Sequence, residues 1–93
     1  MNIKILTPEF VVFEGEVSSV LIPGKNGDFQ IMKDHAAIVA SLIEGKIRLF
    51  TNKIEEQFEG HFTKEMEKES VFSFPVRSGV IEFNNNKGII LAE

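Results

Sequence analysis

Two pairs of side chains in this sequence have types and spacings that can support acid–base chemistry. Asp34 directly precedes His35, and a neighbouring carboxylate can orient an imidazole for proton transfer. Glu14 and Glu16 are two residues apart, which puts both carboxylates on one face of a regular strand, as in the carboxylate pairs of glycosidases. Adjacent strand residues point to opposite faces, so Asp34 and His35 do not form a dyad by default. Two glutamates on a strand are also what a solvated face contains, and we assign no catalytic residue.

The sequence also lacks the patterns of a metal, cofactor or nucleotide site. His35 and His61 are far apart without the spacing of a metal pair, cysteine is absent, and we interpret His61 as exposed. Residues 24–27, Gly-Lys-Asn-Gly, resemble a phosphate loop only superficially, because the Lys-Ser/Thr pair and the following helix are missing. Residues 84–86, Asn-Asn-Asn, are typical of a hairpin turn, since Asn tolerates left-handed backbone. We therefore predict no metal and no cofactor.

The composition describes one small domain that spans residues 1–93. Hydrophobic residues make up 43% of the 93 residues and include nine phenylalanines, which is enough for a single core. The formal net charge of −4 argues against nucleic acid as a partner. No apolar run approaches the roughly 18 residues of a membrane span, and the N-terminus has no signal-peptide pattern. We expect a chain that stays in the cytoplasm.

Strands are the elements that must position these groups. Short apolar runs separated by Gly, Asn, Pro or charged pairs predict an all-β fold, a flattened antiparallel β-sandwich or barrel. The expected strands are 3–6, 11–13, 17–22, 29–31, 36–43, 46–50, 54–62, 71–74, 80–83 and 89–91. We predict a bend at 14–16, a tight turn at Asn26-Gly27 and a buried strand at 36–43. The densely charged residues 63–69 should form a solvated loop or hairpin tip.

Several motifs, in order, resemble the epsilon subunit of bacterial F-type ATP synthase. Residues 12–17, Val-Phe-Glu-Gly-Glu-Val, are similar to the family's V-F-x-G-x-V, and residues 23–29 are similar to its P-G-x-x-G-[ED]-[FL]-G loop. The pattern continues through Ile31, His35-Ala36, the apolar run to Leu42 and Glu44-Gly45-Lys46-Ile47-Arg48-Leu49. Residues 76–83 and 90–93 look like V-S-G-G-F-[VL]-E-V and V-L-A-[DE]. The resemblance therefore covers almost the whole chain.

The chain departs from the family pattern at a few places. Lys33-Asp34 replaces Pro-Gly, Ala37 replaces Pro, Gln30 replaces Gly, and residues 56–70 form a longer segment, which we predict to be a mobile peripheral hairpin. The sequence stops at Glu93, where most members continue into two antiparallel helices that can restrain ATP hydrolysis. The expectation is a subunit without this helical arm.

The resemblance implies a non-catalytic rotor subunit of the central stalk, peripheral on the cytoplasmic face of the bacterial inner membrane, that couples c-ring rotation to gamma and the catalytic head. Its partners would be the gamma subunit and the polar loops of the c-ring. The residues that match the c-ring-facing loop are Asn26, Gly27, Asp28, Phe29, Gln30, Ile31, Lys33, Asp34 and His35. The candidates for the gamma contact, which could equally be core, are Ile38, Leu42, Val80 and Phe83.

Two other functional classes compete with this interpretation. A free-standing β-sandwich binding module for a small polar ligand would need a concave, Asn- and Phe-lined site, and the chain has no Trp or Tyr platform. A small hydrolase built on Glu14 and Glu16 would need a cleft and a raised pKa on at least one carboxyl.

Overall fold

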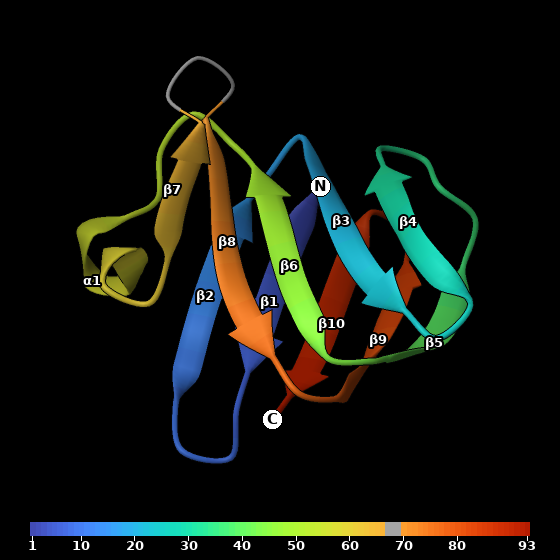
Figure 1. Cartoon of the computed structure of the whole chain (residues 1–93). Coiled ribbons are helices and arrows are strands. Elements are labelled where there is room, and N and C mark those ends of the chain that lie inside the picture. Colours follow the sequence, from blue (N-terminus) through green and yellow to red (C-terminus); the bar gives the residue numbers. More distant parts are fainter. Residues whose placement is uncertain (67–69) are drawn as a thin grey trace.

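The structure, a computed structural model, describes residues 1–66 and 70–93 and contains one strongly curled sheet (Figure 1). The strand order is β2-β1-β10-β9-β5-β3-β6-β8-β7, and β4 pairs with the other edge of β3. The elements are β1 (Asn2–Leu6), β2 (Val11–Glu16), β3 (Ser19–Gly24), β4 (Gly27–Met32), β5 (Ile38–Leu42), β6 (Gly45–Phe50), α1 (Glu56–Glu59), β7 (Thr63–Met66), β8 (Val71–Val76), β9 (Gly79–Asn84) and β10 (Lys87–Ala92). The all-β prediction is confirmed.

The pairing is antiparallel except between β1 and β10, the first and last strands, which run parallel. Register places every second residue of these strands inside the curl. One inner row joins Ile5, Ile90, Ile81 and Ala40, and the first three side chains are fully buried. This alternation builds the core from the concave face of a single sheet.

The bend expected at 14–16 is wrong, because these residues continue β2 and the chain turns at 17–18 instead. Gly15 pairs with Ile3 in the ladder. A side chain at Gly15 would meet the buried ring of Phe13 at 3.2 Å. This glycine therefore makes room for an aromatic side chain within a strand and does not mark a corner.

The prediction of a strand over residues 54–62 is also wrong. Ile54 is buried, α1 forms at Glu56–Glu59, and Phe58 and Phe62 pack against the core. The three apolar side chains recur every fourth residue, which is the period of a helical turn rather than of a strand. The sequence contains this four-residue spacing, but the polar residues between the three apolar ones were interpreted as the solvated face of a strand.

The segment around α1 covers the edge of β2, beside β7 (Figure 1). Its aromatic rings continue the core: Phe13 of β2 lies 5.7 Å from Phe58 and 5.8 Å from Phe62, and Phe62 lies 5.9 Å from Phe74 of β8. The distances are ring-centroid separations typical of packed aromatic pairs. The longer segment of residues 56–70 is therefore partly anchored in the core, which the prediction of a peripheral hairpin missed.

Two further expectations changed in part. Residues 63–66 form strand β7 against β8 rather than a loop, while residues 67–69 lie outside the described residues. The apolar run 36–43 contains strand β5 as predicted, but it is not fully buried, because Val39 is 70% exposed. The β9–β10 turn is confirmed, with Asn85 and Asn86 at φ 51° and 59°.

Candidate partner-binding surfaces

The segment matched to the c-ring-facing loop is mostly a strand. Residues 27–32 form β4, with Ile31 buried, Phe29 half-buried, and Asp28 and Gln30 exposed. The chain turns at 25–26, and Gly27 takes a φ of 115°, a value that favours glycine. The strand predicted at 29–31 is thus confirmed, within the longer β4.

The turn after β4 carries the charges of this segment. Lys33 and Asp34 are exposed, and Asp34 is hydrogen bonded to Asn86 in the β9–β10 turn. His35 is half-buried, with its ring edge-on to Phe83 at 6.0 Å and its Nδ1 2.7 Å from the Ala36 carbonyl oxygen. The His35 imidazole therefore contacts Phe83 and the Ala36 carbonyl oxygen, while the Asp34 carboxylate accepts a hydrogen bond from Asn86. The two side chains do not form a dyad.

Register decides where the four gamma candidates lie. Ile38 pairs with Phe83 and Leu42 pairs with Gly79, and all of these positions are on the inner face. Phe83 and Leu42 are 1% and 4% exposed, so they belong to the core, the alternative that the sequence had left open. Val80 alone among the four points outward, half-buried. Neighbouring residues of a strand point to opposite faces of the sheet, so a shift of one position along the strand exchanges an interface residue for a core residue.

The outward positions form an apolar surface that sequence reasoning missed. Across β1, β10 and β9, Leu6 pairs with Leu91, which pairs with Val80. In the next outer row, Ile89 of β10 and Val39 of β5 both pair with the exposed Glu82 of β9, which lies between them. Leu91 is 51%, Ile89 48% and Val39 70% exposed. We call Leu6, Val39, Val80, Ile89 and Leu91 together the outer apolar face. Its signal was the unbroken run 89–91, since three consecutive apolar residues in a strand must place at least one on each face.

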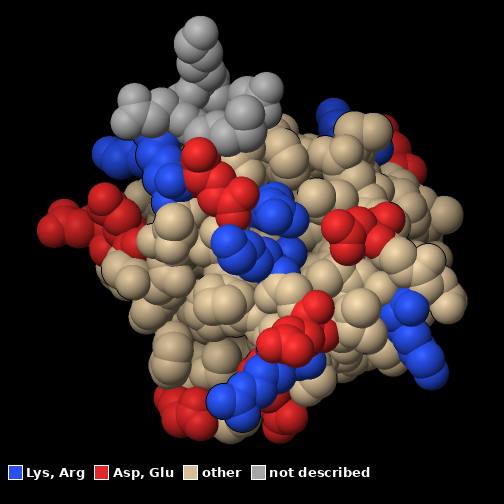
Figure 2. Space-filling view, in the orientation of Figure 1, with Lys and Arg blue, Asp and Glu red and all other residues tan. Residues whose placement is uncertain are grey.

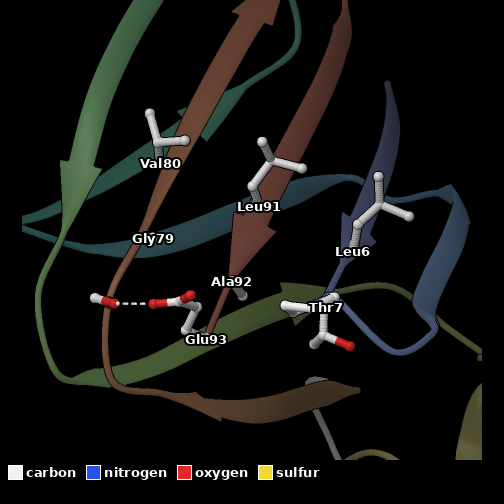
Figure 3. A pocket seen from close by; sticks show the side chains of 9 residues that line it. Leu6, Thr7, Gly79, Val80, Leu91, Ala92 and Glu93 are labelled. Atoms are coloured by element: carbon white, nitrogen blue, oxygen red, sulfur yellow. Dashed lines mark hydrogen bonds between the residues drawn. The ribbon is translucent and has the colours of Figure 1, made fainter.

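A shallow groove lies at one end of the outer apolar face. It has a volume of about 630 Å³ and is lined by Leu6, Val80 and Leu91 together with polar residues near Glu93. Figure 3 shows these three side chains next to one another on the same side of the sheet. The Ser78 hydroxyl donates to Glu93 Oε2 over 3.4 Å at the rim of this groove. The arrangement offers an apolar floor with a polar border, as protein interfaces do.

On the outer face of β6, β8 and β7, charged side chains of β6 and β7 meet across Ser73 of β8. Figure 2 shows acidic and basic side chains next to each other on this side of the molecule. Arg48 Nε lies 3.1 Å from Glu65 Oε1, and Lys46 Nζ lies 3.8 Å from Glu65 Oε2. The Ser73 hydroxyl and then the Arg48 guanidinium lower the pKa of the Glu65 carboxyl from its ordinary value of 4.5. Lys46, Arg48 and Glu65 pair with one another, and this arrangement does not indicate a catalytic site.

The other candidate catalytic side chains have structural roles. Glu16 lies 3.1 Å from the N-terminal ammonium group, and Glu14 is exposed beside it on β2. His61 is half-buried rather than exposed: its Nδ1 lies 3.0 Å from the Val12 carbonyl oxygen and its ring packs 4.7 Å from that of Phe10. Within residues 1–66 and 70–93, no group of three or more His, Cys, Asp or Glu could hold a metal ion.

Comparison with known proteins accounts for this fold and for the motif order. The family model for the β-sandwich domain of the ATP synthase delta/epsilon chain matches residues 1–59. The ATP synthase epsilon chain of Chlorobium limicola is 38% identical over 92 residues, which cover 99% of this chain and 88% of that protein. The chain belongs to the ATP synthase delta/epsilon family. The epsilon chain of Chlorobaculum tepidum is 35% identical, with the same coverage.

Solved structures carry the epsilon-family fold as well. A chain of the Euglena gracilis mitochondrial ATP synthase, resolved with OSCP, F1 and c-ring, matches with a TM-score of 0.71 at 14% identity, and this chain covers 48% of it. A chain of the Tetrahymena thermophila mitochondrial central stalk and c-ring also gives 0.71, at 16% identity with 62% of it covered. At these identities the likeness shows the fold. In the part of the chain that the structure describes, no helix is long and apolar enough to cross a membrane.

Proposed function

We propose that this chain is the epsilon subunit of an F-type ATP synthase, a non-catalytic subunit of the central stalk that couples c-ring rotation to gamma and the catalytic head. The observation that carries the proposal is the end-to-end match to a bacterial epsilon chain, over 99% of this chain and 88% of the relative. The fold suits the task, because a sheet closed around a dense core is stiff and transmits torque through its contacts.

The gamma subunit is the partner that we assign to the outer apolar face. Leu6, Leu91 and Val80 lie side by side on three hydrogen-bonded strands, with Ile89 in the next outer row and Val39 beyond the exposed Glu82. Apolar side chains gathered in this way are costly to leave in water and can supply the buried centre of an interface. Val80, the outward residue of the four sequence candidates, lies within it. Ile38, Leu42 and Phe83 support this face from inside the sheet and do not touch a partner.

The c-ring is the partner that we assign to the β4 segment and the turn after it. Asp28, Lys33 and Asp34 are exposed there and can pair with polar groups of the c-ring loops in a wet interface. A subunit held in this way sits peripherally on the cytoplasmic face of the bacterial inner membrane and needs no membrane span of its own.

Calorimetric titration of this chain into gamma from the same organism tests the proposal. We expect one-to-one binding, and a Leu91→Asp variant should bind at least about 30-fold more weakly, the effect of losing a central interface anchor. Phe10→Asp is the matched control, because Phe10 is 45% exposed, close to the 51% of Leu91, but lies outside the outer apolar face. Absence of binding to folded gamma would contradict the proposal and favour the free-standing binding module.

A further inference from the structure

The turn after β4 is fastened to the β9–β10 turn by a reciprocal pair of hydrogen bonds. Asp34 and Asn86 are 52 residues apart in the sequence. The Asp34 amide donates to Asn86 Oδ1 over 2.7 Å, and Asn86 Nδ2 donates to Asp34 Oδ1 over 2.9 Å. Asp34 has a φ of 67° and Asn86 a φ of 59°, both left-handed. Asn and Asp adopt such backbone more readily than other residues with a side chain, and the two hydrogen bonds stabilise it here.

Asn86 is itself attached to the rigid part of the sheet. Its carbonyl oxygen accepts a hydrogen bond of 2.9 Å from the amide of Asn2, in the first strand. It also occupies the two-residue turn between β9 and β10, whose ladder is regular from end to end. The side-chain amide that holds Asp34 is therefore positioned by three strands.

A second anchor follows immediately in the chain. The His35 amide donates to the Met32 carbonyl oxygen over 3.1 Å, and the His35 ring packs on Phe83 of the core. Lys33 lies inside the turn that the Met32–His35 hydrogen bond closes, next to Asp34, and is exposed. The two anchors hold residues 33–35 in one conformation without any partner present.

We propose that Asn86 is a positioning residue for the c-ring contact: it holds Lys33, Asp34 and His35 in the conformation that meets a polar loop of the c-ring. The inference rests on the proposed function, which assigns this segment to the c-ring. Ordering a flexible segment on binding reduces affinity, and a segment already held in place avoids that loss. Asn86 acts from another turn and need not touch the c-ring.

The neighbouring residue provides a matched control. Asn85 has a similar φ of 51° and is exposed, and no side-chain hydrogen bond of Asn85 is present among the described residues. Glycine tolerates left-handed backbone, so Asn86→Gly removes the amide group and keeps the turn, whereas Asn85→Gly changes the same turn without affecting Asp34.

Two measurements on these variants test the inference. Amide hydrogen exchange of residues 33–35 in the isolated chain reports whether the segment is held. Binding of the chain, in complex with gamma, to detergent-solubilised c-rings reports whether holding it matters. For Asn86→Gly we expect faster exchange at Asp34 and His35 and about fivefold weaker binding to c-rings. Asn85→Gly should change neither quantity.

An exchange of the two side chains distinguishes positioning from general stability. Asn86→Asp places two carboxylates against each other at neutral pH and should resemble Asn86→Gly. The double variant Asp34→Asn with Asn86→Asp restores a donor opposite an acceptor and keeps the net charge, and it should recover slow exchange at residues 34 and 35.

The possible failures are distinguishable. If Asn86→Gly accelerates exchange while c-rings bind it as tightly as the unchanged chain, the positioning role is overturned and the proposed function stands. Failure of the exchanged pair to recover slow exchange would mean that the Asp34–Asn86 hydrogen bonds do not hold the segment, and would also overturn it. If the unchanged chain complexed with gamma does not bind c-rings, the proposed contact itself fails, and the positioning role fails with it.

Discussion

The two outer faces of the same curled sheet differ in a way that the sequence of each strand explains. In β6, residues 46–49 read Lys-Ile-Arg-Leu, so charged outward residues alternate with buried apolar ones before the strand ends at Phe50. In β10, residues 89–91 are Ile-Ile-Leu, so the outward positions are as apolar as the inward one. Strict alternation identifies a face that water covers, while an apolar run in a strand of known register identifies a face that a partner covers.

The largest effect that we expect separates the inner from the outer side of β10. Ile90→Ala should lower the free energy of unfolding by about 3 kcal/mol, because Ile90 is fully buried and its loss leaves a cavity. Leu91→Ala should change stability by less than about 0.5 kcal/mol, since Leu91 is half exposed. Urea denaturation of both variants measures the contrast. Equal losses would mean that the outer apolar face is part of the folding core.

The second prediction separates the two outer faces by their effect on binding. Val39→Asp should weaken binding to gamma about tenfold, because it places an unpaired charge at the outer apolar face. Arg48→Ala, on the charged face, should leave binding unchanged. Calorimetry with both variants tests this, and equal weakening by the two would remove the distinction between the faces.

The third prediction concerns the strength of the charged face. A double-mutant cycle on Arg48→Ala and Glu65→Ala should give a coupling free energy of about 0.5–1 kcal/mol, the range of partly exposed ion pairs. Thermal or urea unfolding of the four proteins yields the value. A coupling of several kcal/mol would mean that this face contributes to the fold as much as core residues do.

The smallest expected effect is a pH dependence confined to Glu65. Its pKa is lowered in the folded chain by Ser73 and Arg48, so its carboxylate stabilises the fold above the ordinary value of 4.5. That contribution is lost as the pH falls below 4.5 through the lowered folded pKa. The stability difference between the unchanged chain and Glu65→Gln should therefore be constant at neutral pH and shrink in acid. A difference that grows as the pH falls would contradict the assigned direction.

The family, most of the strands and the β9–β10 turn could be predicted from the sequence because they depend on motif order, local alternation and turn residues. The strand predicted at 54–62, the bend predicted at 14–16 and the missed strand β7 are the exceptions. The contacts could not be predicted. Whether Phe83 is interface or core depends on strand parity, which only the register with Gly88 and Ile38 defines. The pairing of Asp34 with Asn86 joins two turns far apart in the sequence, and neither residue type indicates the other.

The position of β10 between β1 and β9 affects how the molecule can be made. Of the ten strands that the structure describes, β1 comes first in the sequence, and it pairs with β2 on one side and with β10, the last of the ten, on the other. The β1–β2 hairpin cannot join the rest of the sheet until residues 87–92 have emerged, so closure of the core is expected late in synthesis. Pairing between the two ends of a chain is also a slow, high-contact-order step, during which the apolar edge of β1 remains unpaired. We therefore expect β1 to present an unpaired strand edge, which can associate with other chains, until β10 is in place.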